Sequence, residues 1–81
     1  MQQDEIFEMV KAHIYEVLPD LEGKDISRED RLADLGANSV DRAEVAMLAM
    51  ESLSLQMARI ELAGVRNIGD LVDVLHAKSN A

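Results

Sequence analysis

The chain has no cysteine among its 81 residues, which excludes a disulfide framework, a thiolate metal site and a cysteine nucleophile. It is also poor in aromatic residues, since Phe7 and Tyr15 are the only two. Aliphatic side chains and five methionines must therefore form the core. A chain of this length is sufficient for one small domain, so we expect residues 1–81 to fold as a single unit.

Basic residues are scarce as well, because eight Lys and Arg stand against sixteen Asp and Glu, for a formal net charge of -8. Such a chain repels nucleic acid and anionic membranes and favours basic partners. The N-terminal residues lack the positive start and apolar run of a secretion signal. The longest apolar run, Val45 to Met50, is too short to cross a bilayer. We expect a monomeric, soluble, cytoplasmic protein that binds neither nucleic acid nor membrane.

Hydrophobic periodicity predicts an all-α fold. The first helix is expected from Asp4 to Leu18, and Pro19 cannot continue it. Its apolar stripe has spacings of four, four and three residues. The stripe consists of Ile6, Val10, Ile14 and Val17.

A second helix is expected from about Ser39 to Leu53, and a short third helix from Arg59 to Ala63, ended by Gly64. Asn67 is expected to cap a final helix, and residues 77–81 to fray. The inward positions are Val45, Ala46, Ala49 and Leu53 on the second helix, and Ile68, Leu71, Val72 and Leu75 on the last.

The long connection from Pro19 to Asn38 is unusual in so small a domain unless it is functional or fixed to the core. We expect isolated aliphatic residues to fix it, namely Leu21, Ile26, Leu32 and Leu35. Residues 30–34 are compatible with a short turn of helix, which the sequence does not settle. The prediction is a small bundle of three principal helices and one short helix, with a long first loop.

Ser39 lies where this loop gives way to the second helix. Gly36 permits a tight or left-handed turn before it, and Asn38 and Ser39 are both good helix-capping residues. A lone serine at such a position is more often only a cap. Because Asn38 offers an equivalent cap, Ser39 is free for another role. Its hydroxyl would face the positive end of the helix dipole, which favours an attached anion such as a phosphate ester.

One face of the second helix has the composition of a docking surface. Asp41, Glu44, Leu48 and Glu51 recur at spacings of three, four and three, which aligns them on one side. The carboxylates are expected to flank an exposed leucine, with Val40 and Met47 near its rim. A solvated helix face is the alternative interpretation, because exposed charges contribute little stability.

The segment Leu35-Gly36-Ala37-Asn38-Ser39-Val40-Asp41 resembles the acyl carrier protein motif Leu-Gly-x-Asp-Ser-Leu-Asp, and the resemblance extends over nearly the whole chain. It implies that Ser39 receives 4'-phosphopantetheine from a phosphopantetheinyl transferase. The acyl group would then be held as a thioester on the terminal thiol of this arm. The resemblance also implies a carrier that is not itself an enzyme.

Two residues depart from the common motif, since Asn38 replaces Asp and Val40 replaces Leu. The Asn38 replacement removes a negative charge beside the phosphate. The run from Gly36 to Glu44 is similar to the free-standing donor carriers of polyketide β-branching cassettes. That similarity implies an acetyl or malonyl cargo, with an HMG-CoA-synthase-like condensing enzyme, a ketosynthase-like decarboxylase and an acyltransferase as partners.

Three other functions stay open at this point. The chain is also compatible with a general fatty-acid or polyketide extension carrier, with an unmodified acidic interaction domain, and with a small hydrolase using a Ser39–His–Asp triad. His13 and Glu16 have the helical spacing of a ligand pair, but exposed side chains without a metal are expected there. A deformable core suits shelter for a long acyl chain, which an acetyl cargo does not need. The methionines considered for this core are Met9, Met47, Met50 and Met57.

Overall fold

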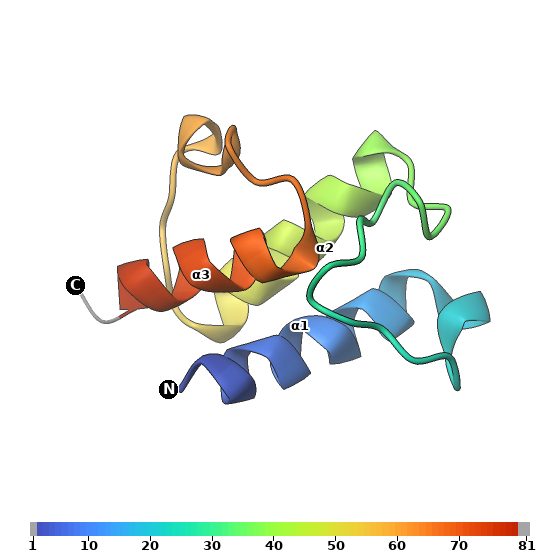
Figure 1. Cartoon of the computed structure of the whole chain (residues 1–81). Helices are drawn as coiled ribbons and strands as arrows, with labels where there is room; N and C mark the ends of the chain where they lie inside the picture. Colours follow the sequence, from blue (N-terminus) through green and yellow to red (C-terminus); the bar gives the residue numbers. More distant parts are fainter. Residues whose placement is uncertain (1, 80–81) are drawn as a thin grey trace.

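The computed structural model describes residues 2–79, and within them the chain is entirely helical and irregular, with no strand (Figure 1). The predicted all-α bundle of three principal helices and a long first loop is confirmed. No helix in this span is long and apolar enough to cross a membrane. The elements are α1 (Gln3–Val17), the 3-10 helix η1 (Pro19–Leu21), α2 (Ser39–Ser52), the 3-10 helix η2 (Arg59–Leu62) and α3 (Ile68–Ser79).

Helix α1 is the element on which the other two principal helices pack (Figure 1). Asp4 and Glu5 lie in its first turn, where the helix dipole favours negative charge. The helix ends at Val17, and the next residues form η1 with Pro19 as its first residue, an element that the sequence did not predict. By contrast, α2 and α3 make few direct contacts with each other.

The buried side chains that the structure describes are all apolar, and none of them is polar or charged. The predicted stripe of α1 is confirmed, with its last member, Val17, half-buried. On α2, Val45 and Ala49 are buried, while Ala46 and Leu53 are half-buried. All four predicted inward residues of α3 are buried. The core residues are Ile6, Val10, Ile14, Leu21, Ile26, Ala37, Val45, Ala49, Ile68, Leu71, Val72 and Leu75.

The long connection is fixed to the core as predicted. Leu21 and Ile26 are buried, and Leu32 and Leu35 are half-buried against the core. Residues 32–36 form consecutive hydrogen-bonded turns instead of a helix. These turns bring the chain to the start of α2.

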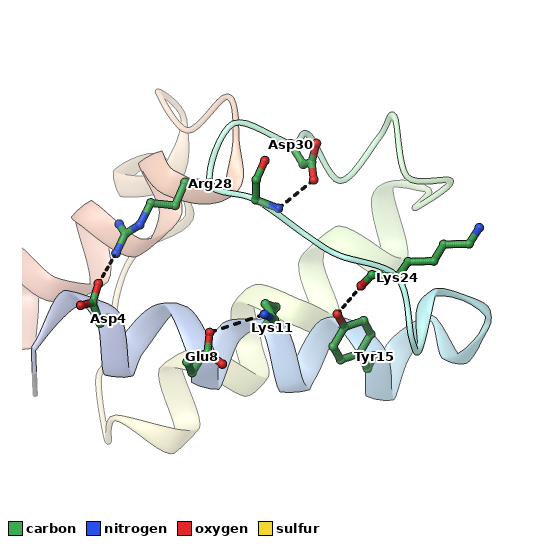
Figure 2. A network of polar contacts seen from close by, with 8 residues as sticks. Asp4, Glu8, Lys11, Tyr15, Lys24, Arg28 and Asp30 are labelled. Carbon is green, nitrogen blue, oxygen red and sulfur yellow. Dashed lines mark hydrogen bonds and ion pairs between the residues drawn. The ribbon is translucent and has the colours of Figure 1, made fainter.

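Polar contacts hold the same connection against α1 (Figure 2). The Tyr15 hydroxyl donates to the Lys24 carbonyl at 2.6 Å. The Arg28 guanidinium lies 3.2 Å from the Asp4 carboxylate and 5.1 Å from the centre of the Phe7 ring. Arg28 therefore joins the middle of the loop to the first turns of α1.

The first turn of α3 is completed by this loop. The Ile68 N–H donates to the Asp30 carbonyl at 3.0 Å, and the Gly69 N–H donates to the Arg28 carbonyl at 2.8 Å. The Asp70 N–H donates to the side chain of Asn67, the predicted cap, at 2.8 Å. These three amides would lack partners in an isolated helix. A side chain at Gly69 would place its Cβ 3.2 Å from two Arg28 atoms, so glycine permits the close approach.

Helix α3 continues further toward the C-terminus than the sequence predicted. The predicted fraying is wrong for residues 77–79, which are helical, and residues 80–81 lie outside the described part. Lys78 explains the difference, because its ammonium lies 2.5 Å from the Glu61 carboxylate and joins α3 to η2. The Ser79 hydroxyl also donates to the His76 carbonyl at 3.1 Å.

Candidate functional site

Ser39 is exposed and is the first residue of α2, and Asn38 is the residue that caps the helix. The Asn38 side-chain oxygen accepts a hydrogen bond from the Asp41 N–H at 2.8 Å. The Asp41 carboxylate in turn accepts one from the Asn38 N–H at 3.2 Å. Such a reciprocal capping box satisfies two helix-end donors at once. Within residues 2–79 the Ser39 hydroxyl has no hydrogen-bond partner, so it is not needed to end the helix.

The residues before Ser39 hold it in place through the backbone. Gly36 has a φ of +99°, in the left-handed region that favours glycine, although the space around it is open. Ala37 is buried, and its N–H donates to the Leu32 carbonyl at 3.0 Å. Its carbonyl accepts from the Arg42 guanidinium, also at 3.0 Å. Ser39 is thus the exposed residue between a buried anchor and a capped helix.

The electrostatic environment of Ser39 fits a phosphodiester on its oxygen. The α2 helix is 14 residues long, so its dipole is developed at the end where Ser39 lies. The cap uses the Asp41 N–H, which leaves the N–H groups of Ser39 and Val40 among the helix-end donors that have no partner within the helix. Those donors point toward an anion placed at the helix start. The negative Asp41 carboxylate would repel such an anion, but this carboxylate accepts a hydrogen bond from the Asn38 N–H.

The predicted docking residues form one surface of α2, which we call the α2 outer face and define as Val40, Asp41, Glu44, Met47, Leu48 and Glu51. Its apolar centre differs from the prediction. Val40 is 71% exposed and Met47 is 53% exposed, whereas Leu48 is half-buried and not an exposed centre. Helical spacing explains this, because Leu48 follows the buried Val45 by three residues and therefore lies beside it at the edge of the buried side of α2. Glu44 and Glu51 are exposed beside the apolar pair.

His13 takes part in a contact that the sequence did not reveal. Its Nε2 lies 2.8 Å from the Ser52 hydroxyl and its Nδ1 lies 3.2 Å from the Glu16 carboxylate. The expectation of an exposed His13 is wrong, because the ring is half-buried where α1 meets α2. Residues 2–79 contain no group of three or more His, Asp or Glu side chains arranged to hold a metal ion.

The order serine, histidine, carboxylate is that of a hydrolytic triad, but this contact lacks the rest of such a site. An acyl-transfer site needs free N–H donors beside the nucleophile to hold the developing oxyanion. The Leu53 N–H instead donates to the carbonyls of Ala49 and Met50, and the Ser54 N–H donates to that of Glu51. The contact therefore serves to join α1 to α2. His13 is also bound to Ser52 and not to Ser39, which removes it from the triad that the sequence left open.

Sequence reasoning missed a pocket of about 450 Å³ between α2, α3 and the segments that precede each of them. We call it the arginine-lined pocket, because Arg31, Arg42 and Arg66 are among its lining residues. Ala43 and Ala46 line it from α2, and their small side chains leave room that larger residues would fill. In the sequence, these two small residues were the signal for a pocket that could have been noticed. The pocket itself could not be predicted, because it depends on how distant segments pack together.

Known proteins with similar sequences and structures cover nearly the whole chain. A family profile described as "Phosphopantetheine attachment site" matches residues 10–75, a span that contains Ser39 and all of α2. The polyketide biosynthesis acyl-carrier-protein AcpK of Bacillus subtilis (strain 168) is 51% identical over 78 residues, which are 96% of this chain and 95% of that protein. An acyl carrier protein of Prochlorococcus marinus (strain MIT 9515) is 31% identical over 78 residues, covering 96% and 98%.

Among solved structures, the crystal structure of the curacin biosynthetic pathway HMG synthase in complex with acetyl donor-ACP contains a chain similar to this one. The two align with a TM-score of 0.91 and 44% sequence identity. The alignment covers 96% of this chain and 100% of that chain. The likeness thus includes the loop, the start of α2 and the helices around them.

Proposed function

The chain belongs to the acyl carrier protein family, and on this premise we propose that Ser39 holds its phosphopantetheine and that the protein donates an acetyl group in polyketide β-branching. Membership of this family means that the chain carries covalently attached 4'-phosphopantetheine. That cofactor excludes the unmodified acidic interaction domain that the sequence left open. It also supplies a terminal thiol, which holds acyl groups as thioesters, to a chain without cysteine.

The assignment to Ser39 rests on one observation, namely that Asn38 and not Ser39 caps the start of α2. Asn38 caps the helix, so the Ser39 hydroxyl is exposed and has no structural task in the described residues. The buried Ala37 fixes the chain immediately before it. An attachment residue must be reachable by a transferase while the fold stays intact, and Ser39 meets both requirements.

The α2 outer face is proposed as the surface on which partners dock. Its exposed Val40 and Met47 offer apolar area, and the surrounding carboxylates suit a partner with basic residues. Charge of this kind speeds encounter, while the apolar side chains supply buried area. The proposed partners are the phosphopantetheinyl transferase, the HMG-synthase-like condensing enzyme, the ketosynthase-like decarboxylase and an acyltransferase, all in the cytoplasm. The chain itself contributes no catalytic group and acts as a carrier.

The donor role is proposed over general chain extension for two reasons. The similar chain in the curacin structure is an acetyl donor in complex with an HMG synthase, and it is 44% identical over nearly all of this chain. The residues Asn38 and Val40, which depart from the common carrier motif, lie on either side of Ser39. Both are exposed, so a partner that approaches Ser39 meets them directly.

The proposal is tested in two steps that separate carrier from donor. Incubation with coenzyme A and a phosphopantetheinyl transferase should raise the intact mass by one arm in the wild type and not in Ser39→Ala. The acetyl-loaded protein should then lose its acetyl group to an HMG-synthase-like enzyme supplied with a β-ketoacyl acceptor carrier. Arm transfer to Ser39→Ala would disprove the attachment residue. Acceptance by a chain-extending ketosynthase, with no turnover by the synthase, would instead support the extension carrier.

A further inference from the structure

A patch of positive charge lies on the surface of this strongly acidic protein. We call it the basic rim and define it as Arg31, Arg42 and Arg66, which are among the residues around the arginine-lined pocket. The described lining residues include no Asp or Glu, although the chain has sixteen of them against eight Lys and Arg. Arg31 precedes the turns that lead to α2, Arg42 lies on α2, and Arg66 lies just before α3. Three separate segments therefore form a surface whose charge is opposite to that of the whole chain.

The guanidinium groups of the basic rim are largely available to a partner. Within residues 2–79 the Arg31 side chain is exposed and makes no hydrogen bond or ion pair. The Arg66 side chain is 81% exposed, and its Nε lies 3.9 Å from the Asp70 carboxylate, a loose pair that holds it weakly. Arg42 uses one of its N–H groups on the Ala37 carbonyl and retains others. Such groups match the planar geometry of the carboxylates on an acidic protein surface.

The basic rim adjoins the α2 outer face. Ala43 lines the pocket, and Met47 of the α2 outer face follows it by four residues, so the two are neighbours on the helix surface. Arg42 follows Ser39 by three residues, or about 4.5 Å along the helix axis. A partner that covers both Ser39 and Met47 therefore also meets the basic rim. The surface presented to that partner has an acidic part and a basic part.

The chemistry of the cargo places recognition on the protein surface. An acetyl thioester on a phosphopantetheine arm is the same chemical group on every carrier, so an enzyme that selects one carrier must recognise the protein that holds the arm. A surface with charge of one sign attracts any partner of the opposite sign. Adjacent patches of opposite sign also fix the register of docking and repel a partner surface that is basic throughout.

We propose that the basic rim pairs with acidic side chains of the condensing enzyme while the α2 outer face meets basic side chains of the same enzyme. The inference rests on the proposed function, in which that enzyme takes the acetyl group from this chain. The basic rim orients the carrier so that the arm on Ser39 enters the enzyme. It also disfavours docking on a chain-extending ketosynthase whose carrier-binding surface is wholly basic.

The test measures steady-state acetyl transfer from the acetyl-loaded chain to the condensing enzyme over a range of carrier concentrations. Arg31→Glu should raise the KM about three- to tenfold, because it places a like charge opposite the acidic side chains of the enzyme. High salt should reduce this difference, since it screens exposed charges. Lys24→Glu is the matched control, because it makes the same change of charge at an exposed loop residue outside the pocket and should leave the KM unchanged. The transferase should load Arg31→Glu at least as fast as the wild type.

Charge reversal on the enzyme then tests the acidic partner directly. Each Asp and Glu around the enzyme's arm entrance is changed to Lys, and one such variant should lower the KM for the Arg31→Glu carrier while raising it for the wild type. The proposal is overturned by an unchanged KM in both Arg31→Glu and Arg66→Glu, or by the absence of any compensating Lys variant. Equal impairment of transferase loading would also overturn it, because the arginines would then act on Ser39 in general. No acetyl transfer from the wild type would instead refute the proposed function.

Discussion

Replacing Asn38 and Ser39 one at a time separates capping from attachment. Asn38→Ala removes the 2.8 Å hydrogen bond to the Asp41 N–H and leaves the Asp41 carboxylate as the remaining half of the capping box. Loss of an asparagine cap costs about 1 kcal/mol, within a range of roughly 0.5–2 kcal/mol. Ser39→Ala removes a hydroxyl without a partner in the described residues, so the change in the free energy of unfolding should stay within about 0.5 kcal/mol.

Thermal unfolding followed by circular dichroism measures this difference. For a domain of this size, a loss of 1 kcal/mol lowers Tm by about 4–8 °C. We expect that decrease in Asn38→Ala and little change in Ser39→Ala. The loading assay should give the opposite order, because Asn38→Ala keeps the hydroxyl proposed to receive the arm while Ser39→Ala does not.

Two results would contradict these separate roles of Asn38 and Ser39. A decrease in Tm as large in Ser39→Ala as in Asn38→Ala would mean that the serine hydroxyl stabilises the helix start. Normal loading of Ser39→Ala would mean that the arm is attached elsewhere. Asn38→Asp is the matched control, because aspartate and asparagine cap about equally well, so its Tm should stay close to that of the wild type.

Further predictions concern the α2 outer face and the end of α3. Glu44→Lys and Met47→Ala should each raise the KM of transferase loading roughly fivefold, equivalent to about 1 kcal/mol. The control Glu22→Lys, a substitution in the exposed loop, should leave this KM unchanged. Unchanged loading kinetics in all three variants would contradict the docking role of the α2 outer face. The pKa of Glu61 is lowered from 4.5, mainly by the hydrogen bond from Lys78 and to a smaller extent by that from the Ala58 N–H. The ionised carboxylate therefore stabilises the fold above pH 4.5, and this stabilisation is lost as the pH falls through the lowered pKa. Lys78→Gln should therefore make the urea midpoint less sensitive to acid, and an identical pH dependence in both proteins would contradict the assignment.

The helices were predictable because their causes are local. Pro19 ends α1, and the periodicity of apolar residues identifies the buried face of α3. The fixing of the long loop was predictable for the same reason, since Leu21 and Ile26 are isolated aliphatic residues among charged ones. The assignment of the cap to Asn38 needed the structure, because two equivalent capping residues stand next to each other in the sequence.

Features that depend on distant contacts were missed or misjudged. Leu48 was expected to be exposed because helical spacing aligns it with acidic residues, but the same spacing places it three residues after the buried Val45, at the edge of the buried side. The helical end of α3 depends on a contact between Lys78 and Glu61, and the contact of His13 depends on Ser52. No sequence pattern predicts the contact between Lys78 and Glu61 or that between His13 and Ser52, because the residues of each pair are far apart in the chain.

The backbone hydrogen bonds between the long loop and the start of α3 also determine how the chain acquires its fold. A helix of 12 residues is marginal on its own, and the first amides of α3 find their acceptors near Arg28 and Asp30. These bonds join residues about forty positions apart, so they form only when the intervening chain is closed into a loop, at a cost in chain entropy. The exchange rates of the Ile68 and Gly69 amide protons therefore report the opening of a loop that lies far before them in the sequence.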